Sequence, residues 1–85
     1  MTSKIQISDW FDEGVKNSKE FLIVVCDTFD WTDYPVYCME SDFKTVYESH
    51  KINMQKVMEV YDLSMDKSDQ LSQNVSMNFP QSYEL

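Results

Sequence analysis

Residues 20–40, EFLIVVCDTFDWTDYPVYCME, are the most informative part of the chain because two apolar runs flank a short polar and aromatic segment. The first run, residues 21–26, is apolar at both sets of alternating positions, which is typical of a strand buried on both faces. The second run contains Pro35, which cannot donate to a neighbouring strand, so Pro35 lies on an edge strand or at its start. Together the runs predict a β-hairpin with the loop FDWTD, residues 29–33.

A helix is predicted over residues 7–18, before the hairpin. Its apolar side chains recur at the spacing of one helix face: Ile7, Trp10, Phe11 and Val15. Ser8 is the expected N-cap, and the first turns then hold the acidic residues that a helix dipole favours there: Asp9, Asp12 and Glu13. Gly14, the only glycine in the chain, weakens the middle of this helix by up to about 1 kcal/mol relative to alanine.

Two more elements follow the hairpin. Residues 41–51 are predicted to form a short helix that begins at Ser41 or Asp42, with apolar and aromatic residues at helical spacing: Phe43, Val46, Tyr47 and His50. Residues 54–63 fit a helix or a strand by periodicity alone. We predict a strand, because a sheet of only two strands is marginally stable.

The expected fold class is therefore α+β, with the order α-β-β-α-β and a three-stranded sheet packed against two helices. A right-handed crossover places the last strand parallel to the second and beyond the first, so the first strand is central. Both helices are expected on one face of the sheet. The other face is also apolar, which predicts either a homodimer interface or a docked C-terminal tail, since large exposed apolar patches are rare.

Residues 1–64 are predicted to form the single domain, and residues 65–85 a flexible polar tail in which Ser, Gln, Asn and Asp dominate. The tail still contains apolar and aromatic residues, so it is alternatively a docking segment that becomes ordered on a partner: Leu71, Val75, Met77, Phe79 and Tyr83.

The charge of the chain limits its partners. Fifteen acidic residues face seven lysines and no arginine, which gives a net charge of −8. This sign disfavours direct binding to nucleic acid or to anionic membranes, and favours a basic or nucleic-acid-binding protein as partner. The alternative meaning of the charge is solubility alone. No signal-peptide pattern opens the chain and no apolar run is long enough to span a membrane, so a cytoplasmic protein with reduced thiols is expected.

Catalytic and metal chemistry find little support in the residue pattern. Cys26 and His50, with Asp27 orienting the imidazole, form the only nucleophile and base pair that includes histidine, but Cys26 continues an apolar strand. The spacing of Asp27, Asp30 and Asp33 lacks the glycine and glutamate of a calcium-binding loop, and one glycine cannot make a phosphate-binding loop. Cys26 and Cys38 are candidates to face each other across the hairpin. No enzyme activity, cofactor or metal site is expected.

The hairpin loop is the candidate binding site, because large aromatics in a turn are enriched in binding hot spots and flanking carboxylates attract a basic partner. The alternative is that Phe29 and Trp31 fold back over the end of the core. The candidate binding residues are Asp27, Phe29, Asp30, Trp31, Asp33 and Tyr34.

Two segments, FLIVVCDTFDWTDYPVYC at 21–38 and NMQKVMEVYDLSMD at 53–66, resemble a family of small phage and bacterial proteins. That family shares a C-D-T-F-x-x-x-D-Y-P-V-Y turn and a later N-M-Q-x-V-M-E-V-Y-x-L segment, and the resemblance covers residues 8–66. It implies a phage or phage-like origin and brings no set of catalytic residues. By analogy with small acidic phage proteins, we expect a protein that binds, and inhibits, a host protein. The alternative function is a homo-oligomeric structural or assembly protein.

Overall fold

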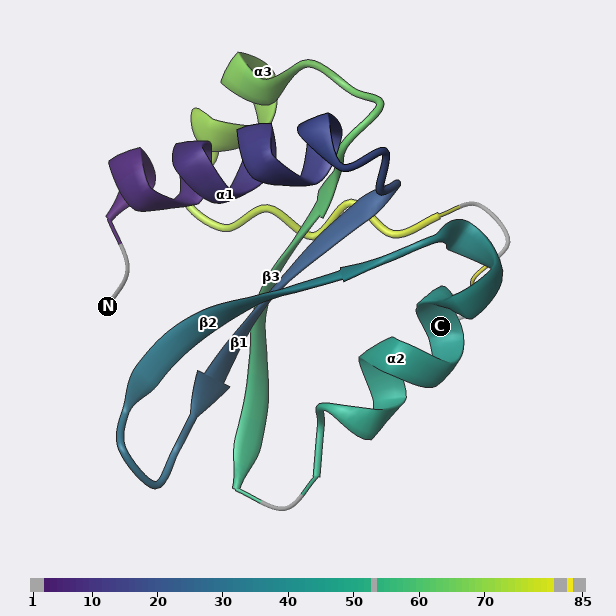
Figure 1. Cartoon of the computed structure of the whole chain (residues 1–85). Coiled ribbons are helices and arrows are strands. Elements are labelled where there is room, and N and C mark those ends of the chain that lie inside the picture. Colours follow the sequence, from purple (N-terminus) through teal and green to yellow (C-terminus); the bar gives the residue numbers. More distant parts are fainter. Residues whose placement is uncertain (1–2, 53, 81–82, 84–85) are drawn as a thin grey trace.

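The computed structural model describes residues 3–52, 54–80 and 83. The helices and strands follow in the order α1 (Lys4–Lys16), β1 (Phe21–Asp27), β2 (Thr32–Cys38), a 3₁₀ turn (Glu40–Asp42), α2 (Phe43–Ser49), β3 (Gln55–Asp62) and α3 (Lys67–Leu71) (Figure 1). This arrangement confirms the predicted α+β class, with helices packed on a three-stranded sheet.

The sheet has the strand order β2-β1-β3, and β1 is antiparallel to both neighbours. The strands β2 and β3 therefore run in the same direction on either side of the central β1, as the sequence predicted. The ambiguous segment at residues 54–63 forms the strand β3. Pro35 lies opposite Val24 on the edge strand β2, where one side of the backbone has no neighbouring strand in the described residues and a missing N–H is tolerated.

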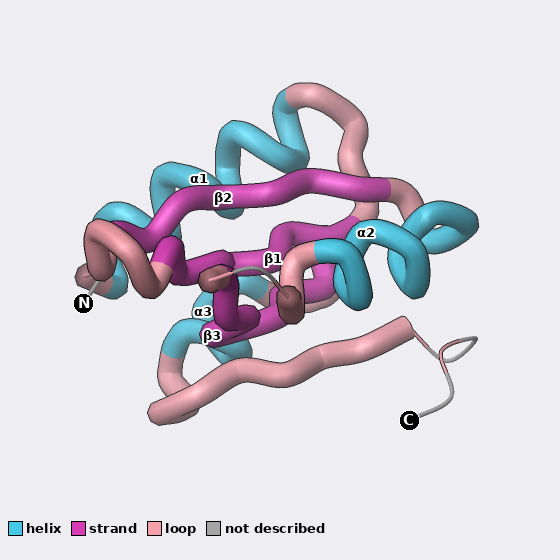
Figure 2. The backbone as a smooth tube through the Cα atoms, turned by 90° about the horizontal axis from the view of Figure 1, so that it is seen from below, coloured by secondary structure: helices cyan, strands magenta, loops and turns pink. Residues whose placement is uncertain are grey.

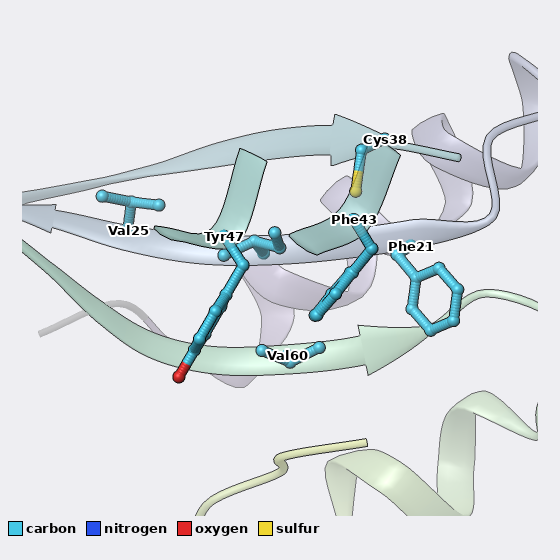
Figure 3. Close-up of a cluster of buried hydrophobic side chains, with 7 residues drawn as sticks. Phe21, Val25, Cys38, Phe43, Tyr47 and Val60 are labelled. Atoms are coloured by element: carbon cyan, nitrogen blue, oxygen red, sulfur yellow. The ribbon is translucent and has the colours of Figure 1, made fainter. Parts of the chain in front are cut away.

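The helices cover both faces of the sheet, which corrects the expectation that they share one face. On one face, α1 supplies Ile7 and Phe11 to a cluster with Leu22, Val24 and Tyr61. On the other face, α2 supplies Phe43 and Tyr47 to a cluster built on the alternate residues of β1, namely Phe21, Ile23 and Val25, together with Cys38 and Val60 (Figure 3). Because β1 is apolar on both sides, other residues must pack against each face of the sheet. The short connections at residues 17–20 and 39–42 do not determine which face a helix packs against.

The helix α1 begins earlier than predicted. Ser3, not Ser8, is the N-cap, and its Oγ accepts a hydrogen bond from the Gln6 N–H at 3.2 Å. The first turn therefore has no acidic residue. Val15 is half exposed, and it is Gly14 that faces the core. The early start places Ile7 one turn inside the helix, where it is fully buried.

The helix α2 is also shorter than predicted. The first residues of the expected helix form the 3₁₀ turn, and Asp42 occupies the N-cap position without a side-chain hydrogen bond. His50 follows the last turn as C-cap.

The structure differs from the expected flexible tail over residues 66–80. Asp66 caps α3 by accepting a hydrogen bond from the Asp69 N–H at 3.1 Å. The chain then returns along β3, where the Val60 N–H donates to the Ser76 carbonyl at 2.8 Å and the Asn78 N–H donates to the Val60 carbonyl at 3.0 Å. In Figure 2 this returning segment runs beside the sheet as an extended stretch. Residues 81, 82, 84 and 85 lie outside the described residues.

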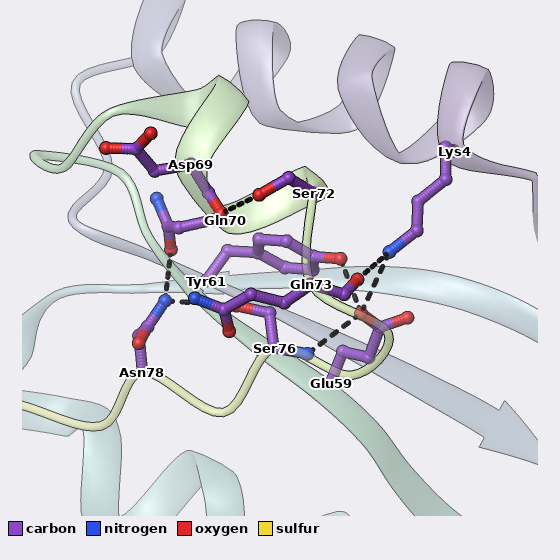
Figure 4. A network of polar contacts seen from close by, with 9 residues as sticks. All are labelled: Lys4, Glu59, Tyr61, Asp69, Gln70, Ser72, Gln73, Ser76 and Asn78. Carbon is purple, nitrogen blue, oxygen red and sulfur yellow. Dashed lines mark hydrogen bonds and ion pairs between the residues drawn. The ribbon is translucent and has the colours of Figure 1, made fainter.

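A buried amide holds the returning segment in place. The Gln70 Oε1 accepts from the Asn78 Nδ2 at 2.8 Å (Figure 4). The same oxygen accepts from the Asp62 N–H, and the Gln70 Nε2 donates to the Asp62 carbonyl, each at 2.8 Å. Both Gln70 and Ser76 are buried, so these polar groups are satisfied within the protein. Composition alone indicated disorder because such residues are polar. Their mutual hydrogen bonds, which depend on the fold, make them structural.

Candidate functional site

Two loops lie together at one end of the sheet. The β1–β2 turn spans residues 28–31, and the described part of the α2–β3 connection is residues 50–52 and 54; both lie at the lower end of the view in Figure 1. The Thr28 N–H donates to the Met54 carbonyl at 2.8 Å, which joins them directly. They present four exposed large apolar side chains, which we call the loop-end surface: Phe29 and Trp31, each 72% exposed, Ile52, 57% exposed, and Met54, 58% exposed.

The hairpin turn is fixed by its own hydrogen bonds. The Asp27 Oδ1 accepts from the Phe29 N–H at 2.9 Å, and the Asp27 carbonyl accepts from the Trp31 N–H at 2.6 Å. The turn is shorter than the predicted five residues, because Thr32 and Asp33 already pair with β1. These two hydrogen bonds define the backbone conformation in which the turn presents Phe29 and Trp31.

Backbone strain is concentrated on the same surface. Among the described residues, only Ser18, Trp31 and Met54 have a positive φ, at 60°, 58° and 65°. Ser18 ends α1, which is a common place for this conformation. Trp31 and Met54 are both exposed apolar residues on the loop-end surface, and the left-handed conformation costs about 1–2 kcal/mol for a residue with a Cβ. Neither side chain is buried in this conformation.

The structure brings most of the predicted binding residues together. Phe29, Asp30 and Trp31 are exposed, so the alternative in which the two aromatic rings cover the core is wrong. Asp27 is partly buried at the base of the turn. Tyr34 is separate from this group: its hydroxyl donates to the Gln55 Oε1 at 3.0 Å, on the face of the sheet that α2 covers.

Tyr34 also makes an edge contact with the ring of His50, at 6.5 Å between centroids. Burial raises the pKa of Tyr34 above its ordinary value, and the nearby carboxylate of Asp27 adds to this shift. The Tyr34 hydroxyl therefore stays neutral at physiological pH and acts as a structural hydrogen-bond donor.

A small pocket adjoins Trp31 on the face of the sheet that α1 covers. Cys26 lies in the central strand, opposite Asp33 of β2 on one side and Lys56 of β3 on the other. These three residues, with Trp31 and Met58, line a pocket of about 220 Å³. The sequence analysis missed Lys56 and Met58. Only the register of β3 against β1 brings them here, and the sequence does not give that register.

The Cys26 thiol is not an activated nucleophile. Its pKa is raised by burial first, and then by its hydrogen bond to Asp33 and the charge of that carboxylate. Cys26 points to the α1 side of the sheet, whereas His50 contacts Tyr34 on the α2 side. The His50 Nδ1 lies 2.8 Å from the Val46 carbonyl. The two residues therefore do not form a nucleophile and base pair.

The two cysteines do not face each other across the hairpin. Cys26 is paired with Asp33, near the turn, and Cys38 with Phe21, at the far end of the same two strands. Both thiols are free and buried. Burial raises the pKa of Cys38 to about 11, with smaller effects from nearby carboxylates.

A metal-binding cluster and a membrane-spanning helix are both absent from the part of the chain that the structure describes. No group of three or more His, Cys, Asp or Glu side chains is placed to hold a metal ion there. None of the described helices is long and apolar enough to cross a membrane.

Comparisons of the chain with protein-family models, with curated proteins and with solved structures found no significant match.

Proposed function

We propose that this protein is a non-enzymatic, acidic protein-binding module of phage origin that binds and inhibits a protein in the cytoplasm of a bacterial host. The loop-end surface and its flanking aspartates form the contact. The observation that carries the proposal is the 72% exposure of both Phe29 and Trp31 on a hydrogen-bonded turn. The phage origin is part of the proposal and comes from the expectation that the sequence pattern of residues 21–38 and 53–66 raised.

Exposed aromatic side chains on a rigid turn are suited to binding. Tyrosine, tryptophan and arginine dominate the hot spots of protein interfaces, and phenylalanine is enriched in interfaces as well. Because the turn is already held by Asp27, little backbone entropy is lost when a partner binds. Ile52 and Met54 extend the apolar area on the neighbouring loop.

The strain at Trp31 and Met54 supports the same conclusion. Both residues occupy a conformation that glycine adopts at lower cost, and neither gains burial in exchange. Unfavourable backbone conformations at exposed residues are concentrated at functional sites. A gain in binding is the physical reason that accounts for keeping large side chains at these two positions.

Charge defines the class of partner. Asp27, Asp30 and Asp33 alternate with the aromatic residues along the hairpin, in a chain with a net charge of −8. A basic surface on the partner, such as that of a nucleic-acid-binding protein, would be steered toward these carboxylates. Added salt would weaken the approach, because exposed charges are screened over about 8–10 Å.

The argument for a homo-oligomer rested on an uncovered apolar face of the sheet. In the described residues, α1 and α3 cover one face, while α2 and the aromatic residues Phe79 and Tyr83 cover the other. That reason for self-association is therefore absent, although self-association through the loop-end surface remains an outcome that the experiment below detects.

Capture from a nuclease-treated bacterial lysate, at low and at moderate salt, tests the proposal. The Asp30→Lys variant reverses a charge beside the aromatic residues, and Asp9→Lys makes the same change on the exposed side of α1. Phe29→Ala and Ile5→Ala form a second pair, since both residues are exposed and apolar but only Phe29 belongs to the loop-end surface.

We expect one stoichiometric protein whose capture is reduced by Asp30→Lys and Phe29→Ala but not by Asp9→Lys or Ile5→Ala. Loss at moderate salt would further support a basic partner. Equal capture by all four variants would refute the loop-end surface as the contact. Capture of the protein's own copies alone would support the oligomeric alternative instead.

A further inference from the structure

The pocket beside Trp31 has a size and lining that suit a single side chain. Its volume of about 220 Å³ is below the roughly 300–1,000 Å³ of pockets that hold drug-sized ligands. Cys26 lies between Asp33 and Lys56 in the three strands, and Met58 and the Trp31 ring complete the lining. The pocket therefore combines an apolar lining with one carboxylate and one ammonium group.

The negative wall of the pocket is the Asp33 carboxylate, which accepts a hydrogen bond from the Cys26 thiol. Asp30 precedes Trp31 in the turn and is exposed. Of the hairpin aspartates, Asp33 lies in the lining together with Lys56, and Asp30 is next to Trp31 in the chain.

We infer that this pocket receives one arginine side chain from a basic segment of the partner protein, with the guanidinium stacked on Trp31 and bonded to Asp33. The inference rests on the proposed function and names the group that the same surface recognises. The net charge of −8, the Asp33 carboxylate in the lining and the exposed Asp30 beside Trp31 in the chain favour a cationic group. The apolar lining matches the hydrocarbon part of a long side chain.

Arginine fits better than lysine for three physical reasons. Its guanidinium is planar and stacks on an aromatic ring, which a compact ammonium does not match. Its fork of N–H groups can bond both oxygens of one carboxylate. It is also more weakly hydrated than an ammonium, so its transfer into a partly apolar pocket costs less.

Lys56 gives the inference a test with the opposite sign. Its ammonium repels a cation in the pocket, so Lys56→Met should strengthen arginine binding, whereas Asp33→Asn should weaken it. General damage to the fold would weaken binding in both variants. The exposed Asp9 on α1 provides a control, because Asp9→Asn removes the same charge away from the pocket.

NMR titration of the full chain with three acetylated and amidated pentapeptides tests the inference. Each peptide has glycine at four positions and carries arginine, lysine or citrulline at the centre. Citrulline keeps the shape of arginine without its charge. The two tryptophans provide an internal comparison, because Trp31 lines the pocket whereas Trp10 packs against the core beneath α1.

We expect the arginine peptide to shift the Trp31 indole N–H and the Met58 methyl signal, with the Trp10 indole unchanged. Lysine should bind about threefold to tenfold more weakly, and citrulline should give no saturable shift. Asp33→Asn should weaken arginine binding about tenfold, and Lys56→Met should strengthen it.

The outcomes separate this inference from the proposed function. Equal effects of arginine and lysine, spread over all acidic residues, would mean nonspecific attraction and would overturn the pocket inference. Absence of any shift at Trp31 would also overturn it. In either case the proposed function would still stand if capture of the lysate partner depends on Phe29 and Asp30. If capture does not depend on these residues, the proposed function would fail together with the pocket inference.

Discussion

At the scale of single residues, the close approach of the α1 backbone to the sheet constrains position 14. Gly14 lies in the middle of α1, where glycine is normally unfavourable. A Cβ built at Gly14 would lie 2.7 Å from the Leu63 Cδ1 and 2.8 Å from the Tyr37 Cε1. The Tyr37 ring cannot easily move away, because its hydroxyl donates to the Trp10 carbonyl at 2.8 Å. Gly14 therefore sets the distance between α1 and the sheet.

Replacing Gly14 by alanine is expected to lower the free energy of unfolding. The gain in helix propensity is about 1 kcal/mol, but overpacking against Leu63 and Tyr37 costs about 1–3 kcal/mol, so the net loss is about 1 kcal/mol. Urea unfolding followed by circular dichroism measures it. Val15→Ala, at a half-exposed position of the same helix, should change stability little. A clear stabilisation by Gly14→Ala would contradict the close approach.

At the scale of elements, the C-terminal segment is a structural part of the fold. The Phe79 ring lies against Phe43 and Tyr47 of α2, with centroids 5.8 Å and 5.2 Å apart, and stacks on Tyr83 at 5.4 Å. The Val60–Met77 bridge extends the sheet beyond β3. Together these contacts cover the α2 side of the sheet, which the first 64 residues leave partly open.

The Phe79→Ala variant should therefore be destabilised by about 2 kcal/mol, which is below the 3–5 kcal/mol of a fully buried phenylalanine because Phe79 is only partly buried. Val75→Ala changes an exposed residue of the same segment and should leave stability nearly unchanged. Thermal unfolding of both variants makes the comparison. Equal stability of the two would mean that the segment contributes nothing, as expected of a flexible tail.

At the scale of the whole molecule, buried neutral acids link stability to alkaline pH. Burial raises the pKa of Cys38 to about 11 from its ordinary 9.0, and burial also raises the pKa values of Tyr61 and Tyr37. A hydrogen bond to Glu59 adds to the shift at Tyr61. In each case the folded protein favours the protonated form, so the unfolded chain loses its proton first as the pH rises.

Stability should therefore be fully retained below about pH 9 and should fall as the pH rises toward about 11. Urea unfolding at a series of pH values through this range measures the slope. Cys38→Ala removes one of the titrating groups and should make the slope shallower, even if the variant is less stable at neutral pH. A stability that stays constant or increases across this window would contradict the assignment of buried neutral thiol and phenol groups.

The sequence predicted local features well and failed where three-dimensional pairing decides. The doubly apolar β1 and the edge position of Pro35 follow from period and backbone chemistry. The strand at 54–63 followed instead from the marginal stability of a two-stranded sheet, because its period also fits a helix. The face of the sheet that each helix covers is not determined by the short connections and has no local signal in the sequence. The packing of residues 66–80 depends on hydrogen bonds of Gln70 with Asp62 and Asn78, which no local sequence pattern predicts.

The candidate site was predicted in part for the same reason. The aromatic and acidic residues of the hairpin turn are adjacent in sequence, so their proximity was evident before the structure. Ile52, Met54, Lys56 and Met58 join them only through the contacts of β3 and its preceding loop with the hairpin. The positive φ of Trp31 could not be predicted, because tryptophan is an unfavourable residue for that conformation.

We propose that the Trp31 side chain contributes to binding while its backbone conformation lowers the stability of the fold. The Trp31→Gly variant tests this most directly. Relief of the left-handed conformation, about 1–2 kcal/mol, exceeds the entropy cost of glycine, about 0.5–1 kcal/mol. Ser18→Gly makes the same backbone change at the end of α1. Urea unfolding and lysate capture should be measured on both variants.

We expect both variants to be more stable than the parent protein, by about 0.5 kcal/mol. Only Trp31→Gly should lose the captured partner. A stable Trp31→Gly variant that captures the same protein as strongly as the parent and Ser18→Gly would contradict the account.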